Sequence, residues 1–165
     1  MTLDEHAMQL GRLVANFQSL EFLLRAFLQD TPSARPVGVP HGTDIYSYPV
    51  GTDLPESELT SYDSLGQLIG KYNKEIGKRG LPPIDETLVE IRDALAHGRV
   101  SAADPENNLR LLKFSKPAGG RVSVAFNEEL SSDWFSAQRK RVFEAMQAVV
   151  QNGKWTIVET KVKRG

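Results

Sequence analysis

The sequence predicts a mainly helical protein, an up-and-down bundle of about four helices with a small β-hairpin inserted. Apolar residues recur at steps of three and four along four segments, which is typical of amphipathic helices. Residues 109–127 alternate instead between apolar and polar side chains on both sides of a Pro-Ala-Gly-Gly turn, which is typical of a hairpin. Four helices and one small sheet together indicate a bundle.

Composition fits this class and excludes several kinds of function. A chain of 165 residues with 40% apolar and 25% charged residues is expected to form one domain, residues 1–165, with its own core. The absence of cysteine excludes a disulfide framework, a thiolate nucleophile and a sulfur-based zinc site. The net charge of -1 provides no global basic field, so any contact with nucleic acid must be local.

The start of the chain predicts a cytoplasmic protein that does not contact a membrane. Asp4 and Glu5 stand where a secretory signal peptide would carry basic residues. In addition, no apolar run approaches the length that is needed to span a bilayer.

The first helix is expected from about Asp4 to Gln29, followed by a long loop. Residues 30–60 contain five prolines and three glycines, which remove backbone donors and disfavour a helix repeatedly. Within this loop, residues 45–48 have the composition of a short strand. A loop of this length inside a small domain is typically functional or mobile.

Three further helices are expected after the loop. The second resumes the helical period near Ser61 and stops in the stretch 77–83. The third opens after Pro83 and ends at Gly98, a residue that often terminates helices. The fourth runs from about Ser132, expected to be its N-cap, to Asn152, and the alternating residues 155–162 are expected to add a strand to the hairpin.

One segment of the third helix carries chemically suggestive residues, Arg92-Asp93-Ala94-Leu95-Ala96-His97. On an ideal helix Arg92 and His97 lie about 140° apart around the axis, so the two side chains do not stack on one face. Asp93 and His97 are four residues apart and do face each other. A second copy of the helix across a dimer axis would complete a site that one helix cannot form.

This segment resembles the signature of the HEPN superfamily, helical proteins named for nucleotide binding in higher eukaryotes and prokaryotes. The signature is an arginine, a polar residue, three further residues and a histidine, which here are Arg92, Asp93, residues 94–96 and His97. Gly98 fits the same local pattern. The resemblance covers the helical framework and leaves the loop 30–60 and the hairpin unexplained.

The resemblance implies a metal-independent RNA endonuclease of the toxin or defence type, with a composite site in a homodimer and no cofactor. His97 would act as acid-base catalyst, because the pKa of a histidine lies near physiological pH. Arg92 would stabilise the charge that develops on the phosphate, and Asp93 would orient His97. Arg99 would contact the RNA backbone. An antitoxin or another protein is an expected partner.

The main alternative from a different class is a non-catalytic module for nucleotide binding or protein interaction. Arg92 and Asp93 would then form surface ion pairs, and His97 would interact with the dipole at a helix C-terminus. A His97 buried against its own chain would favour this alternative. Two copies of the arginine and histidine that converge on one cleft would favour the enzyme.

Glu21 is the second residue of interest, because it lies on the apolar stripe of the first helix between Phe17 and Leu24. A carboxylate at such a position needs a partner, since its unpaired burial is costly. We expect Glu21 to support the site by contacting Arg92 or a donor near it. Pairing with Arg25, one turn along the same helix, is the alternative. The three histidines lie in separate segments without metal-ligand spacing, so no metal site is expected.

Overall fold

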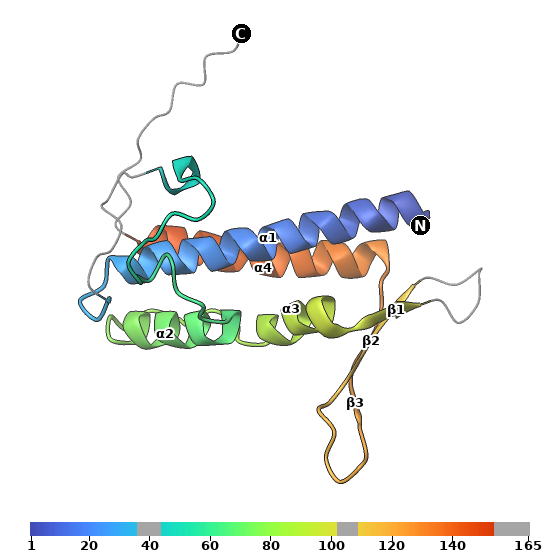
Figure 1. Ribbon diagram of the computed structural model, residues 1–165. Coiled ribbons are helices and arrows are strands. Elements are labelled where there is room, and N and C mark those ends of the chain that lie inside the picture. Colours follow the sequence, from blue (N-terminus) through green and yellow to red (C-terminus); the bar gives the residue numbers. More distant parts are fainter. Residues whose placement is uncertain (36–43, 102–108, 154–165) are drawn as a thin grey trace.

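The computed structural model describes residues 1–35, 44–101 and 109–153, and it shows a mainly helical protein with one three-stranded sheet (Figure 1). This confirms the predicted fold class of four helices with an inserted hairpin. In chain order the elements are α1 Leu3–Gln29, the 3-10 helix η1 Ile45–Ser47, α2 Leu65–Gly77, α3 Leu88–His97, β1 Arg99–Ser101, β2 Arg110–Phe114, β3 Val124–Glu129 and α4 Ser132–Asn152. None of the helices among these residues is long and apolar enough to span a membrane.

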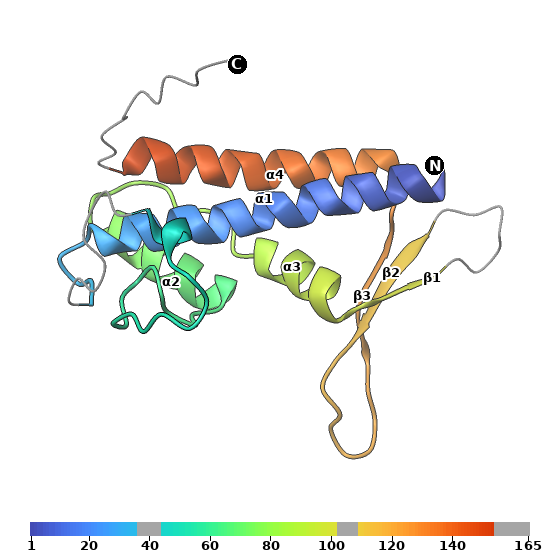
Figure 2. The ribbon, with the colours of Figure 1, turned by 45° about the horizontal axis from the view of Figure 1, so that its top comes forward.

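The two long helices α1 and α4 lie side by side and run in the same direction (Figures 1 and 2). His6 near the start of α1 packs edge-on against Phe135 near the start of α4, with ring centroids 5.6 Å apart. At the other end, Phe27 and Asn152 line one small cavity. Strict alternation of helix direction is therefore not observed, because the long connection between α1 and α2 allows neighbouring helices to run parallel.

Helices α2 and α3 follow one another along the same side of the α1 and α4 pair (Figure 2). The rings of Phe27 in α1 and Tyr72 in α2 meet edge to face at 4.8 Å, and Asn152 in α4 donates a hydrogen bond of 2.9 Å to the Tyr72 hydroxyl. Helix α3 runs antiparallel to α1, since Glu21 contacts its first half and Val14 lies opposite its last turn. The two short helices thus cover successive parts of α1.

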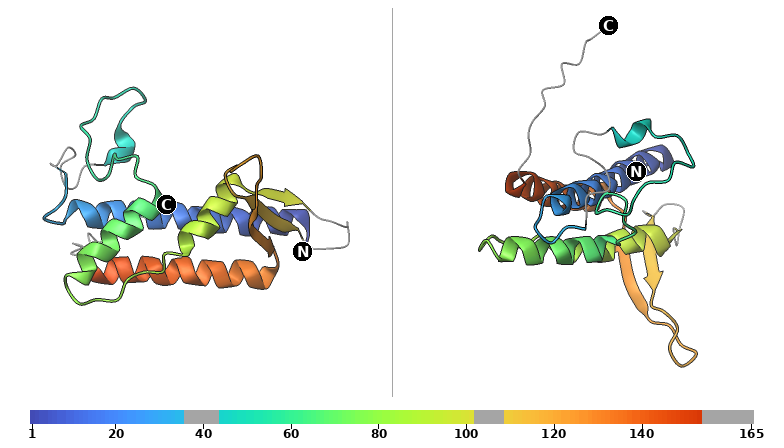
Figure 3. Two further views of the ribbon diagram at one scale, coloured as in Figure 1. Left: turned by 90° about the horizontal axis from the view of Figure 1, so that it is seen from below. Right: turned by 60° about the vertical axis from the view of Figure 1, so that its left-hand side comes forward.

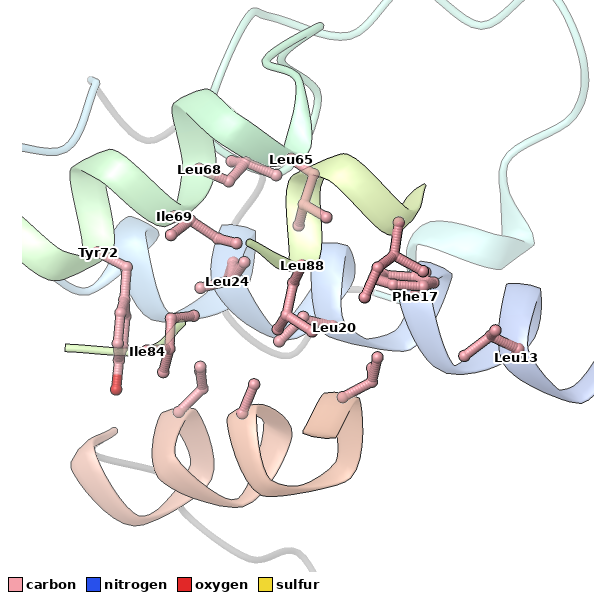
Figure 4. Close-up of a cluster of buried hydrophobic side chains, with 14 of the residues drawn as sticks. Leu13, Phe17, Leu20, Leu24, Leu65, Leu68, Ile69, Tyr72, Ile84 and Leu88 are labelled. Carbon is pink, nitrogen blue, oxygen red and sulfur yellow. The ribbon is translucent and has the colours of Figure 1, made fainter. Parts of the chain in front are cut away.

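Side chains from all four helices meet in one hydrophobic core, of which Figure 4 shows the central part. The apolar residues of α1 recur at helical spacing, which places them on a single face toward α2 and α4. The core residues with no exposed surface are Leu13, Leu20, Leu24, Leu68, Ile69, Tyr72, Ile76, Leu88, Ala94, Leu130, Phe135, Val142 and Val149. Burial of this apolar surface is the main force that stabilises the bundle.

Several predicted boundaries differ from the structure. The second helix begins at Leu65 rather than near Ser61, because Ser64 forms a capping box with Gln67. The third begins at Leu88 rather than after Pro83, because the Asp85 carboxylate accepts hydrogen bonds from the backbone N–H and hydroxyl of Thr87. The fourth is capped by Ser131 rather than Ser132.

The Asp85 turn is fixed to α4 by Arg141, whose guanidinium donates to the Asp85 carboxylate at 2.6 Å and also to the Thr87 hydroxyl. These hydrogen bonds lower the pKa of Asp85 to about 2, with Arg141 the largest cause and Thr87 the next. The residues before α3 therefore form a turn that is tied to another helix.

The predicted long loop is present in its described parts, and two of its residues contact α2: Ser33 donates a hydrogen bond of 2.8 Å to Glu75, and Glu58 accepts one from Lys71. Glu58 is only 4% exposed and, with Asp63, accepts hydrogen bonds from Lys71 at 3.3 and 2.6 Å. Arg35 forms an ion pair of 2.7 Å with Glu56. Residues 45–47 form a 3-10 helix that Asp44 caps, so the strand expected at 45–48 was wrong.

The predicted hairpin is confirmed as β2 and β3, and a third strand that was not expected joins it. β1 follows α3 directly and pairs antiparallel with β2, which pairs antiparallel with β3. Most of the hairpin extends away from the helices (Figure 3). The strand predicted at 155–162 lies outside the described residues.

Candidate functional site

Helix α3 places the motif residues by burying one face against the rest of the bundle. Leu88, Ile91 and Ala94 recur every third residue and are all buried. Arg92 is consequently at the edge of the buried face, where its side chain is 37% exposed. His97 is the last residue of the helix and is exposed.

Arg92 is held by Glu21 of α1. The Arg92 Nε donates a hydrogen bond of 3.1 Å to Glu21 Oε1, and the Glu21 side chain is 21% exposed. Arg25, the alternative partner, instead donates to the Asp63 carbonyl oxygen at 2.8 Å. The expected contact between Glu21 and Arg92 is therefore confirmed. A carboxylate on one edge of a guanidinium restricts its orientation and leaves other N–H groups free to donate.

An open pocket of about 310 Å³ adjoins this ion pair between α1 and α3. Its polar groups are Gln18, Glu21 and Arg92, and its remaining lining is apolar. Those apolar residues are Val14, Phe17, Leu95 and Ala96. The pocket combines an apolar surface with a cation that is already oriented, which suits a ligand or a partner that carries negative charge beside an apolar part.

Asp93 does not contact His97 as expected. Its carboxylate lies 3.6 Å from the Lys113 Nζ of β2, and no hydrogen bond joins it to His97. The carboxylate is 44% exposed and Lys113 is 25% exposed, so this is a partly solvated ion pair. Asp93 therefore contributes to the contact between α3 and the sheet, because β2 passes the end of the helix.

The His97 imidazole forms no hydrogen bond or ion pair with any residue that the structure describes, and it is not buried against its own chain. It also does not line the pocket that Arg92 and Ala96 line. The spacing explains this, since five residues turn the helix by about 500° and direct the two side chains to different sides. A single chain thus leaves Arg92 and His97 apart.

Gly98 allows the sheet to start at the end of the helix. A Cβ at this position would lie 2.4 Å from the Ala94 carbonyl oxygen and 2.6 Å from a methyl group of Leu111. Such distances are shorter than any van der Waals contact, so only glycine fits without a shift. The chain consequently passes from His97 into β1 within one residue.

Arg99 of β1 is exposed, and its guanidinium lies over the ring of Phe114 in β2, 5.2 Å from the ring centroid. This distance is within the range of a cation-π contact. Neither Phe114 nor Lys113 was singled out by the sequence reasoning. The available signal was the run of basic residues in the hairpin, which contains no acidic residue between 109 and 126.

No group of three or more histidine, aspartate or glutamate side chains in the described segments could hold a metal ion. Comparison with known proteins adds no relative, because no protein family, characterised protein or solved structure matches the chain.

Proposed function

We propose that this protein is a homodimeric, metal-independent ribonuclease of the HEPN type. The observation that carries the proposal is the pair of motif residues on α3: Arg92 is oriented by Glu21 beside an open pocket, and His97 is exposed and unpaired within the described residues. An imidazole can transfer protons and an oriented arginine can stabilise charge on the phosphate, and together these two functions can support cleavage of RNA without a metal.

The proposed reaction uses the 2′-hydroxyl of the substrate as nucleophile. His97 takes the proton of the 2′-hydroxyl and then donates it to the leaving 5′-oxygen, which returns the imidazole to its neutral form. The 2′-oxygen forms a bond to the adjacent phosphorus while the bond from phosphorus to the 5′-oxygen breaks. The products are a 2′,3′-cyclic phosphate and a free 5′-hydroxyl. Arg92 stabilises the negative charge on the phosphoryl oxygens.

A dimer would bring an arginine and a histidine of the motif together at one phosphate. One chain cannot do so, since Arg92 and His97 of the same helix point to different sides. The surface around the pocket is partly apolar, with Val14 38% exposed and Phe22 41% exposed two turns along α1. Such a surface can pair with a second copy of itself about a twofold axis. In the proposed dimer, Arg92 of one copy and His97 of the other act on the same phosphate.

The alternative is a non-catalytic module for nucleotide binding or protein interaction. The contact of Asp93 with Lys113, rather than with His97, favours it, because no residue described here orients the imidazole. In that case Glu21 and Arg92 would serve only to hold α3 against α1, and the pocket would bind a nucleotide or a partner protein without cleavage.

The test is incubation of a mixed RNA pool with the purified full chain in EDTA, with analysis of the product ends. We expect fragments with 2′,3′-cyclic phosphate and 5′-hydroxyl ends, no cleavage of DNA, and loss of activity in Arg92→Ala and His97→Ala variants that fold normally. Lys74→Ala, a change at an exposed position of α2, is the matched control. Absence of cleavage at concentrations where the protein is dimeric would favour the binding module.

A further inference from the structure

The hairpin has a charge that differs from the rest of the chain. Residues 109–126 contain four basic residues and no acidic residue, whereas the whole chain has a net charge of -1. Lys116 and Arg121 at the tip are exposed and form no ion pair with any described residue. Acidic residues of β3 occur only at the base, where Glu129 lies 4.0 Å from Arg110. The arm is therefore a local basic surface that extends from the bundle (Figure 3).

The register of the sheet separates its residues onto two faces. Leu111 is 1% exposed and packs toward α3, and Lys113 on the same face contacts Asp93. Alternate residues of β2 therefore point to the opposite face. We call this opposite face, with Arg99, Arg110 and Phe114, the outer face. Arg99 pairs with Leu112 in the register, which places its side chain on this face too.

The outer face combines groups that bind unpaired bases and phosphates. Phe114 offers a ring on which a base can stack, and the guanidinium of Arg99 above it is both planar and positive. Lys116 and Arg121 supply further positive charge at the tip, whereas the charge of Arg110 at the base is paired with Glu129. Stacking requires bases that are not paired, so this arrangement suits single-stranded RNA rather than a duplex.

The position of the face connects it to the proposed site. Only Gly98 separates His97 from Arg99, so β1 continues directly from the helix that carries the motif. RNA that lies on the outer face would pass the end of α3. The positive charge of the arm complements the phosphate backbone of RNA. An acidic protein would match this charge too, but it would not account for the aromatic ring of Phe114 on the same face.

We propose that the outer face and the hairpin tip bind single-stranded RNA and guide it to His97. The inference rests on the proposed ribonuclease function for its role in cleavage, but binding can be measured without cleavage. The experiment therefore uses the full-length His97→Ala protein and follows fluorescence anisotropy of a labelled, unstructured RNA of about 12 nucleotides.

Two sets of substitutions test the positive charge of the hairpin tip and the stacking surface of Phe114 separately. Lys116→Glu with Arg121→Glu is expected to weaken binding by about 10-fold or more and to reduce the slope of log Kd against log salt by about 1.4. The double change Lys74→Glu with Lys140→Glu, at exposed positions of α2 and α4, alters the net charge equally and is expected to have little effect. Phe114→Leu keeps an apolar side chain, removes the stacking surface, and is expected to weaken binding by about 10-fold.

The outcomes separate this inference from the proposed function. If the two charge variants weaken binding equally, or if a duplex or polyglutamate binds as tightly as the single strand, the inference is overturned even when the wild-type protein cleaves RNA. If binding depends on the hairpin while the wild type does not cleave, the RNA surface is supported and the ribonuclease proposal fails. Absence of RNA binding by the His97→Ala protein would also overturn the inference.

Discussion

Glu21 of α1 and Arg92 of α3 form an ion pair between the two helices, with Oε1 and Nε 3.1 Å apart. Both side chains are partly exposed, so the pair contributes at most about 1 kcal/mol to the free energy of unfolding. Its larger consequence is the orientation of Arg92 beside the pocket. Loss of the ion pair should therefore change the free energy of unfolding little and the orientation of Arg92 strongly. For this reason, substitutions at Glu21 can distinguish a positioning role from a structural one.

Glu21→Ala is expected to lower the rate of RNA cleavage by about 10-fold or more, because a misplaced guanidinium no longer matches the developing charge. Glu21→Gln keeps an oxygen that accepts from Arg92 Nε and is expected to recover part of the rate. Single-turnover cleavage and thermal unfolding measure the two effects. Glu90→Gln, on the exposed side of α3, is the matched control. A parallel loss of stability and rate in both Glu21 variants would argue against positioning.

A mixture of the inactive Arg92→Ala and His97→Ala proteins is expected to recover activity when the two are unfolded and refolded together. Half of the resulting dimers are mixed, and one of the two composite sites in each is complete, so about one quarter of the wild-type rate is expected. The two proteins refolded separately and then assayed are the controls. Failure to recover activity, with mixed dimers demonstrated by mass spectrometry, would exclude a site shared in this way.

Gly98→Ala is expected to destabilise the fold by about 1–3 kcal/mol, because the new methyl group overlaps the Ala94 carbonyl oxygen and Leu111. Gly70→Ala is the contrasting change within α2, where a Cβ meets nothing within 4 Å. That variant is expected to gain about 0.5–1 kcal/mol from helix propensity. Urea unfolding followed by circular dichroism measures both, and equal effects of the two changes would contradict the close approach at Gly98.

His6 makes stability depend on pH. It is 8% exposed and packs against Phe135, and no residue in the described part of the chain forms a hydrogen bond with its Nδ1. Burial lowers its pKa below the usual 6.5. The unfolded chain therefore takes up a proton at a higher pH than the folded protein does. The free energy of unfolding is expected to fall as pH decreases below about 6.5 toward the lowered pKa of the folded state.

The His6→Phe variant isolates this effect, because it removes the titrating group and keeps a ring against Phe135. Urea unfolding at a series of pH values between about 7.5 and 5 should show a smaller loss of stability in the variant than in the wild type. Identical pH profiles for the two proteins would show that His6 titrates alike in the folded and unfolded states.

The sequence by itself determined the helical class, the hairpin and the placement of Arg92, Asp93 and His97 on one helix. These features are local: the period of apolar residues shows which side of a helix is buried, and a turn sequence between alternating segments specifies a hairpin. The pairing of Glu21 with Arg92 was also expected, because a carboxylate on an apolar stripe needs a partner. Local sequence did not determine whether Arg92 or Arg25 is the partner of Glu21, since this depends on which helix packs against α1.

Only the tertiary structure decided the relations between elements. The parallel direction of α1 and α4 depends on how the long connection returns the chain, and the period of a helix says nothing about it. Strand β1 is too short to be recognised from three residues and exists because β2 lies beside it. Asp93 contacts Lys113 rather than His97 because the sheet passes the end of α3, a packing contact between segments twenty residues apart that local spacing does not encode.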